Sequence, residues 1–221
     1  MQVAAPVAIN PSQSRKVVVV NHPLVATKLS VLRAKTTAPE EFRRNLNEIS
    51  LLLAVEAAQS WQTERIEVET PLTSCAGARL AQSVALVPIL RAGLGMSEAI
   101  FQLMPQASVG HIGLYREKKT LRPVNYYTRL PAHIDRDHVL LLDPMLATGF
   151  SACEAVNVLK QHGVTRIQFL CIIGCDAGVE QLHRDHPEVE IITAAIDPIL
   201  NDHGYIVPGL GDAGDRYFGT E

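Results

Sequence analysis

The arrangement of apolar and polar residues along the sequence predicts alternating strands and helices. From residue 84 onward there are short, uninterrupted apolar runs, which are typical of strands buried on both faces of a sheet. Between them lie stretches whose apolar residues recur at spacings of three and four, as in amphipathic helices. We predict strands at 84–90, 108–115, 139–142, 166–174 and 189–196, and helices around 96–104, 151–163 and 179–186.

A longer helix is predicted closer to the N-terminus. The stretch from Thr37 to Glu40 has the pattern of a capping box, with a proline near the helix start. We therefore expect a helix from Pro39 to Gln59. The apolar positions that define its buried face are Phe42, Leu46, Ile49, Leu53 and Ala57.

Continuous apolar strands separated by helices indicate an α/β fold. Each crossover between parallel strands lays a helix over the sheet, so we predict a doubly wound, mainly parallel sheet flanked by helices. The interval 116–133 is too polar for a core, and its Tyr-Tyr-Thr run predicts one strand of a projecting β-hairpin arm. We expect residues 1–16 to be a loose tail and residues 17–221 to form a single domain.

The amino-acid composition argues against several classes of protein. Apolar residues make up 47% of the 221 residues, and 20 basic residues stand against 23 acidic ones, a net charge of -3. This balance argues against a nucleic-acid-binding or membrane-surface protein. The apolar runs are shorter than the ~20 residues that span a bilayer. The four cysteines lie in apolar surroundings without a C-x-x-C pair, which predicts packed, reduced thiols and a cytoplasmic protein.

The loop that follows the predicted strand at 139–142 has the residues of a ligand-binding site. In parallel sheets ligands bind outside the carboxyl ends of the strands. Here the sequence reads Asp143-Pro-Met-Leu-Ala-Thr-Gly-Phe-Ser151 and enters a helix. An acid, a tight turn, two hydroxyls and a helix start favour a phosphate cradle, although the loop is not a nucleotide P-loop. The alternative is that Thr148 or Ser151 is an ordinary N-cap and Asp143 a turn former.

Two arginines also come directly after predicted strands. Arg91 comes directly after the strand at 84–90 and is followed by Ala-Gly-Leu-Gly, and Arg116 follows the strand at 108–115. Each alone fits a solvated or salt-bridged residue. Together with the cradle, two cations at neighbouring strand ends favour a ligand that carries phosphate or diphosphate.

The C-terminal stretch Gly209-Leu-Gly-Asp-Ala-Gly214 matches the G-x-G-x-x-G pattern of dinucleotide-binding proteins. That fingerprint must follow a strand, open a helix and precede an acidic residue by about 20 positions. Only seven residues follow Gly214, so neither the helix nor the second strand fits. We therefore interpret the segment as a glycine-rich terminal loop and not as a nicotinamide site.

Taken together, these segments resemble the uracil phosphoribosyltransferase family. The resemblance is carried by "VPILRAGLGM", "LYREKKTLRPV", "LLLDPMLATGFS" and "HGYIVPGLGDAGDRYFGT", and by "NHPLVATKLSVLR" and "FRRNLNEISLLLAVEA" nearer the N-terminus. It covers the sequence from Val17 to the end. It implies a type I phosphoribosyltransferase fold with a C-terminal base-binding loop, or hood. The implied reaction converts uracil and 5-phospho-α-D-ribose 1-diphosphate (PRPP) to UMP and diphosphate in pyrimidine salvage, with Mg²⁺ carried mainly by the substrate.

The resemblance also implies site residues. The residues expected to act in catalysis are Arg91, Arg116 and Asp212, and the proton of uracil N1 is expected to pass to Asp212 or to water. The residues expected to bind PRPP are Arg91, Arg116, Asp143, Pro144, Met145, Leu146, Ala147, Thr148, Gly149, Phe150, Ser151 and Asp212. Those expected to bind uracil are Ile206, Gly211, Asp212 and Ala213, where small residues let the backbone reach the base.

Three sites depart from the family pattern, and one of them is Arg122, a hairpin residue where the family more often has an acid. Phe150 stands where the family typically has a second glycine, and Asp176 and Ala177 replace a Pro-Glu pair. Phe150 would be strained if its φ were positive and tolerated if its backbone were helical, as its place at a helix start favours. The alternative function is a catalytically weakened homologue that binds nucleotide and regulates a partner. Family resemblance further implies a homodimer or larger homo-oligomer and makes GTP a candidate effector.

Overall fold

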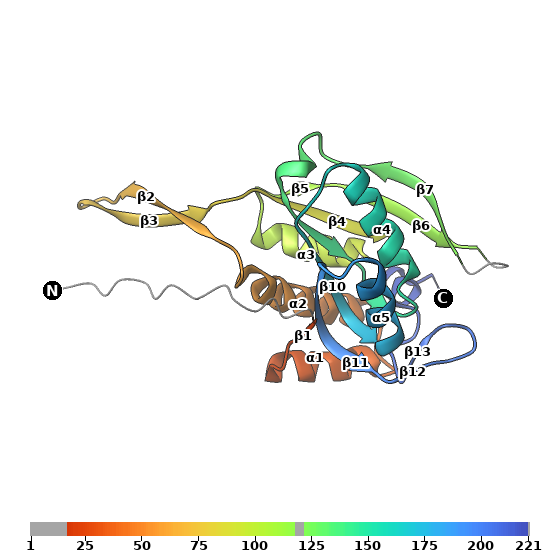
Figure 1. Ribbon diagram of the computed structural model, residues 1–221. Helices are drawn as coiled ribbons and strands as arrows, with labels where there is room; N and C mark the ends of the chain where they lie inside the picture. Colours follow the sequence, from red (N-terminus) through yellow and green to blue (C-terminus); the bar gives the residue numbers. More distant parts are fainter. Residues whose placement is uncertain (1–16, 118–121, 221) are drawn as a thin grey trace.

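The fold is built around one large, mostly parallel sheet. The computed structural model describes residues 17–117 and 122–220 (Figure 1). In sequence order, the elements are β1 (Val17–Val19), α1 (Pro23–Arg33), α2 (Pro39–Ala58), β2 (Thr63–Glu69), β3 (Ser74–Leu80), β4 (Val84–Leu90), α3 (Leu94–Leu103), β5 (Ser108–Val109), β6 (His111–Arg116), β7 (Pro123–Arg129), the 3₁₀ helix η1 (Ile134–Arg136), β8 (His138–Leu142), β9 (Met145–Leu146), α4 (Phe150–Gln161), β10 (Ile167–Cys175), α5 (Asp176–Asp185), β11 (Glu190–Asp197), β12 (Ile199–Leu200), β13 (Ile206–Val207) and α6 (Ala213–Phe218).

Within the described residues the strand order is β1-β11-β10-β8-β4-β6-β7. Neighbouring strands are parallel from β1 to β6, and only β7 at the edge is antiparallel. The short strands β5 and β9 extend the pairing of β4 and β10. The predicted α/β fold with a mainly parallel sheet is confirmed.

Both faces of the sheet are covered, which is why its strands are continuously apolar. In β8, Leu140 and Leu142 enter one hydrophobic core, and the alternating residues Val139 and Leu141 enter the other. Side chains of successive strand residues point to opposite faces, so an uninterrupted apolar run fits burial on both sides. Helices α1, α2, α3 and α6 cover the first face, and α4 and α5 cover the second (Figure 1).

The predicted long helix is present as α2, but the capping box is wrong. The N-cap of α2 is Ala38, and no side chain hydrogen-bonds to the helix start. Thr37 instead donates its hydroxyl to the carbonyl of Val31 in α1, at 2.6 Å. The last carbonyls of a helix lack partners within it, so the threonine caps the end of α1 and leaves the start of α2 to Pro39.

Two hairpins extend the fold. The predicted one is formed by β6 and β7 at the sheet edge, and its turn residues 118–121 lie outside the described part. The sequence did not predict a second hairpin, formed by β2 and β3, which projects from the body as a separate two-stranded sheet (Figure 1). Most of its side chains are exposed, so its residues carry no core pattern.

The remaining sequence predictions about the fold concern the N-terminal tail, the cysteines and membrane-spanning segments. The predicted loose tail, residues 1–16, lies outside the described residues, and the single domain over 17–221 stays a prediction. Cys153, Cys171 and Cys175 are buried as expected, whereas Cys75 is exposed on the β2–β3 hairpin, so the prediction of a packed thiol is wrong there. Among the described helices, none is long and apolar enough to cross a membrane.

Candidate active site

The sheet has a switch point between β4 and β8. The backbone leaves β4 toward β6 on one side and leaves β8 toward β10 on the other. The two loops that follow these parallel strands therefore diverge at the carboxyl edge of the sheet, and ligands of open α/β sheets bind in that crevice. These loops are 91–93 and 143–149, where the sequence placed Arg91 and the phosphate cradle.

The two loops are in direct contact through Gly93. A Cβ atom at Gly93 would lie 2.3 Å from the carbonyl oxygen of Leu142, the last residue of β8. It would also lie 2.9 Å from backbone atoms of Ile89. Because backbone cannot yield as a side chain does, this close approach requires glycine. Gly93 thus brings the arginine loop against the loop that carries Asp143.

The segment from Asp143 to Ser151 forms an open helix start. Gly149 is the N-cap of α4 with φ +81°, and no side chain hydrogen-bonds to the first turn. The alternative in which Thr148 or Ser151 caps the helix is therefore wrong. Free N–H groups at a helix start, together with its dipole, are suited to an anion.

Phe150 is compatible with this geometry. It is the first residue of α4, so its backbone is helical, and the left-handed conformation falls on Gly149. Its side chain is 43% exposed. The expected tolerance of phenylalanine at this position is confirmed for the backbone, because the strain considered from the sequence requires positive φ.

The other departure lies at the start of α5. Asp176 and Ala177 are both exposed. The residue that touches the cradle is the next one, Gly178, where a Cβ atom would lie 2.5 Å from the carbonyl oxygen of Leu146 and 2.6 Å from that of Ala147. The contact with the cradle is thus made by Gly178 and not by the two departing residues.

Other cradle residues serve the sheet. Met145 and Leu146 form β9 and pair with β10. The carbonyl of Pro144 accepts the N–H groups of Ile172 at 2.9 Å and Ile173 at 3.1 Å. Proline has no N–H of its own, so Pro144 anchors the loop to β10 and presents little polar surface to a ligand.

Asp143 stands at the centre of the crevice. Burial raises the pKa of its carboxyl to about 7, and the nearby charge of Asp212 also raises it, while the N–H of Met145, 3.3 Å from Oδ1, acts in the opposite direction. Asp212 belongs to the C-terminal loop, so its charge acts on Asp143 from that loop. An acid whose pKa is shifted by burial and a second acid is typical of a functional site.

The shift predicts that Asp143→Asn stabilises the ligand-free protein, and more so as pH rises. Charging Asp143 in the folded state costs free energy from about pH 4, its unfolded pKa, up to about pH 7, and asparagine avoids this cost. Allowing for solvent screening, we expect about 1–2 kcal/mol, or roughly 2–8 °C in melting temperature, above pH 7.

Thermal unfolding of both proteins at pH 5, 7 and 8.5 measures this difference. All other titratable groups are present in both proteins, so their effects cancel in the difference. An equal difference at all three pH values would contradict a raised pKa of Asp143.

Arg91 extends from the end of β4 and is more than half exposed, at 57%. Its Nη2 lies 3.2 Å from Oδ1 of Asp215, and its guanidinium carbon lies 5.7 Å from the ring centroid of Phe218. An exposed ion pair of this kind contributes about 0–1 kcal/mol. Arg91 can therefore exchange Asp215 for an anionic ligand at little cost.

Arg116 is the last residue of β6, and its side chain lies outside the described part of the structure. The backbone places it at the carboxyl edge, because β6 is parallel to β4 with Gly113 opposite Leu90. Its role stays a prediction.

The C-terminal loop closes the crevice. Ile206 is buried on β13, Gly211 is exposed with φ +79°, and Ala213 begins α6. Asp212 is the N-cap of α6 and accepts the N–H of Asp215 at 2.9 Å. α6 has six residues, too short for the helix of a dinucleotide fold, which agrees with the rejection of that interpretation.

The C-terminal segment contacts both the arginine loop and the start of α3. A Cβ atom at Gly214 would lie 3.7 Å from Cβ of Ala92, in ordinary contact. A Cβ atom at Gly95 would lie 2.3 Å from the ring of Tyr217, so the glycine makes room for that ring. The structure thus places the loops that carry Arg91, Asp143 and Asp212 next to one another, and the roles of these residues stay predictions.

Two carboxylates of this site suit a divalent cation that arrives with a ligand. The described residues contain no group of three or more His, Cys, Asp and Glu side chains that could hold a metal ion. Asp143 and Asp212 are two carboxylates of this site, and the charge of Asp212 raises the pKa of Asp143. Mg²⁺ is commonly held by one or two carboxylates plus substrate phosphates. The donor set therefore suits an ion that arrives with a phosphorylated substrate.

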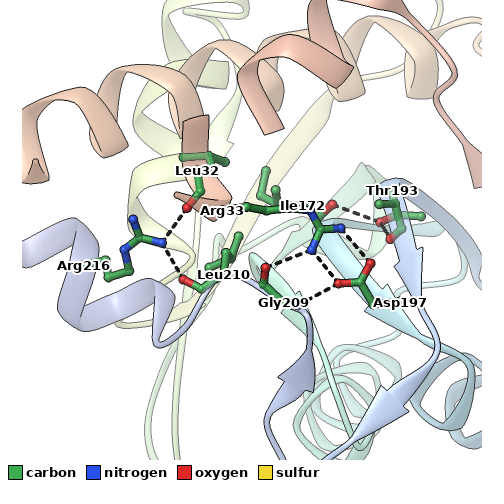
Figure 2. Close-up of polar contacts among 9 residues, drawn as sticks. Leu32, Arg33, Ile172, Thr193, Asp197, Gly209, Leu210 and Arg216 are labelled. Atoms are coloured by element: carbon green, nitrogen blue, oxygen red, sulfur yellow. Dashed lines mark hydrogen bonds and ion pairs between the residues drawn. The ribbon is translucent and has the colours of Figure 1, made fainter. Parts of the chain in front are cut away.

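Sequence reasoning missed three residues that hold the C-terminal loop: Arg33, Asp197 and Arg216 (Figure 2). Asp197 ends β11 just as Asp143 follows β8, so attention to residues after apolar runs would have found it. Arg33 ends α1, a helix that was not predicted, and its partner is 164 positions away. No local pattern marks that pairing.

Comparison with known proteins identifies relatives over nearly the whole sequence. The family model for uracil phosphoribosyltransferase matches residues 19–220. A uracil phosphoribosyltransferase of Dictyoglomus turgidum is 56% identical over 206 residues, which are 93% of this protein and 100% of the relative.

Solved structures show the same architecture. One of a protein from Aquifex aeolicus has a TM-score of 0.89 at 36% identity and covers 93% of this protein and 99% of its own length. An adenine phosphoribosyl transferase from Trypanosoma brucei, with a TM-score of 0.57 at 13% identity over 90% of both proteins, shares the fold.

Proposed function

The chain belongs to the uracil phosphoribosyltransferase family, and we propose that it transfers the phosphoribosyl group of PRPP to uracil, giving UMP and diphosphate. One observation carries the proposal for this molecule. An exposed arginine, an uncapped helix start and a glycine-rich loop converge on the switch point of the sheet. These parts suit a diphosphate, a sugar phosphate and a base, respectively.

We assign the sugar phosphate of PRPP to the start of α4. The first turn of α4 has no side-chain cap, so its N–H groups are available to an anion, and Thr148 and Ser151 carry hydroxyls next to it in the sequence. Phosphate is stabilised there by N–H donors and the helix dipole. Asp143, at the end of β8, is suited to accept hydrogen bonds from the ribose hydroxyls.

We assign uracil to the C-terminal loop. A pyrimidine edge presents alternating N–H and C=O groups, with which backbone carbonyl and N–H groups pair directly. Gly211 has no side chain that would keep the base away from the backbone. The backbone groups of Ile206 and Ala213 are assigned to the remaining hydrogen bonds with the base edge. Asp212 follows Gly211 directly and is suited to contact both the base and PRPP.

The reaction is a displacement at the anomeric carbon of the ribose. The N1–C1′ bond forms while the bond from C1′ to the diphosphate oxygen breaks, and the N1 proton passes to Asp212 or to water. Arg91 and Arg116 stabilise the charge of the departing diphosphate, and Mg²⁺ bound to PRPP neutralises further charge. Holding uracil N1 over C1′ lowers the entropic cost of the encounter.

The direct test is incubation of the full-length protein with labelled uracil, PRPP and Mg²⁺, followed by chromatographic separation of UMP. Radiolabel in UMP that requires both substrates supports the proposal. Absence of UMP from folded protein would overturn it.

The second function considered from the sequence, a weakened homologue that regulates a partner, rests on Phe150 and on Asp176 and Ala177. Phe150 fits a helical backbone, and the contact with the cradle is made by Gly178. No observation on the described residues favours that alternative.

Phe150→Gly is expected to leave the KM for PRPP within about twofold, since the side chain is exposed and substitution of an exposed side chain commonly changes free energies by roughly 0.5 kcal/mol. Its melting temperature should fall slightly, because glycine costs up to ~1 kcal/mol in a helix. Steady-state kinetics and thermal unfolding measure both. A large gain in activity would instead show that the ring obstructs the cradle.

We also propose that the protein forms a homo-oligomer. The β2–β3 hairpin is a separate two-stranded sheet with mostly exposed side chains. Isolated two-stranded hairpins are marginally stable in water, so a second subunit packed along this arm would stabilise it. GTP as an effector remains a prediction from family resemblance, to be examined by adding GTP to the same assay.

A further inference from the structure

The base-binding loop is held from outside by side chains of distant elements. Arg33 at the end of α1 donates two hydrogen bonds to the carboxylate of Asp197 at the end of β11, from Nη1 and Nη2, each at 2.7 Å (Figure 2). Such fork-to-fork pairing fixes the relative orientation of both groups. It joins α1 to the carboxyl edge of the sheet.

Both partners of this pair also grip the backbone of Gly209. Nη1 of Arg33 donates to the carbonyl of Gly209 at 2.8 Å, and the N–H of Gly209 donates to Oδ2 of Asp197 at 2.9 Å. Asp197 is 5% exposed. Burial alone would raise its pKa, but the hydrogen bonds from Arg33 and Gly209 lower it, so the carboxylate remains charged. We call Arg33, Asp197 and Gly209 the loop clamp.

Gly209 needs this support because of its conformation. Its φ is +57°, and a Cβ atom there would lie 2.1 Å from the carbonyl oxygen of Ile206. The turn from Ile206 to Gly209 is therefore closed by bare backbone, and position 209 has no side chain to anchor it. The clamp supplies the anchor immediately before Gly211 and Asp212.

Arg216 gives a second link from α1 to the same loop. Its guanidinium donates to the carbonyls of Leu32 and Leu210, the latter at 2.6 Å, and to that of Ala34 at 2.7 Å. It lies over the ring of Phe42, 4.4 Å from the centroid. The backbone on both sides of Gly211 is thus held in place against α1. The cradle is held differently, by the arginine loop at Gly93 and by α5 at Gly178.

We propose that Arg33 and Asp197 are positioning residues that set the geometry of the base-binding loop, and therefore govern the affinity for uracil separately from the affinity for PRPP. This inference rests on the proposed function. Neither side chain needs to touch the substrates. Their effect passes through Gly209, two residues before Gly211.

Arg33→Lys and Asp197→Asn test the proposal. Lysine keeps the charge but loses the fork, and asparagine keeps the shape but loses the charge. Each should raise the KM for uracil about tenfold or more, a loss of roughly 1.4 kcal/mol, while the Kd for PRPP measured by calorimetry stays within twofold of wild type. Arg33→Met should have the larger effect of the two changes at position 33, with Lys restoring part of it.

Lys28→Gln is the matched control. It also removes an ion pair of α1, with Glu48 on α2, but that pair does not contact the loop. It should leave both substrate affinities unchanged. Hydrogen exchange should show faster exchange of amides around 206–214 in Arg33→Lys, and no change there in Lys28→Gln.

The outcomes separate the two hypotheses. A folded wild type that makes no UMP overturns the proposed function, and this inference with it. An active wild type whose clamp variants bind uracil normally, lose affinity for both substrates equally, or unfold where Lys28→Gln does not, overturns the clamp alone.

Discussion

Arg91→Gln is expected to lower kcat by about 10²–10³, equivalent to roughly 3–4 kcal/mol of transition-state stabilisation. Diphosphate gains negative charge as its bond to C1′ breaks, and a preorganised cation beside it acts mainly on that charge. Glutamine retains a hydrogen-bond donor of similar reach but no charge. Arg91→Lys should recover only part of the rate, because an ammonium cannot pair bidentately with phosphate oxygens.

The stability of the Arg91 variants should change little. The pair with Asp215 is exposed on both sides, at 57% and 37%, and such pairs contribute about 0–1 kcal/mol. Arg44→Gln is the matched control, since Arg44 is 67% exposed and lies 3.8 Å from Glu41 on α2. Full activity in Arg91→Gln, or an equal loss in both variants, would remove Arg91 from the mechanism.

The fold could be predicted from the sequence where a segment is buried on both faces and all its residues are therefore apolar. Strands β4, β8 and β10 are apolar throughout because both faces of the sheet are covered. Helix α1 carried a signal too, with buried Val25, Leu29 and Leu32 at spacings of four and three, although it was not predicted. The β2–β3 hairpin differs, since a strand exposed on both faces has no apolar pattern to detect.

The site was predictable where its residues follow strands. Arg91 and Asp143 lie at the ends of β4 and β8, so the rule for parallel sheets locates them without coordinates. Contacts between distant segments depend on topology instead. Arg33 and Asp197 pair because α1 crosses the end of β11, an arrangement that neither segment specifies alone.

The backbone conformation at Phe150 could not be predicted from the sequence. The sequence allowed either a strained left-handed residue or an unstrained helical one, because both fit a turn that leads into a helix. The structure assigns the positive φ to Gly149 and the first helical position to Phe150. Phenylalanine at position 150 is therefore tolerated because the positive φ falls on the residue before it.

Gly93→Ala is expected to reduce kcat/KM more than about 100-fold, since misplacing a catalytic group by ~1 Å costs a factor of this size. Its Cβ atom would lie 2.3 Å from the carbonyl oxygen of Leu142, so the arginine loop must move away from the cradle. Overpacking against backbone should also cost ~2–3 kcal/mol, or roughly 5–10 °C in melting temperature. Thermal unfolding and steady-state kinetics of the folded protein measure the two effects.

Gly77→Ala on the β2–β3 hairpin separates loss of a glycine from loss of the contact between the loops. Its Cβ atom would also be crowded, at 2.5 Å, but by Cγ2 of Val68, a side-chain end on an exposed hairpin that can rotate. Both activity and melting temperature should stay near wild type there. If Gly93→Ala behaved in the same way, the approach of the two loops would not be what assembles the site, and the placement of Arg91 beside Asp143 would need another cause.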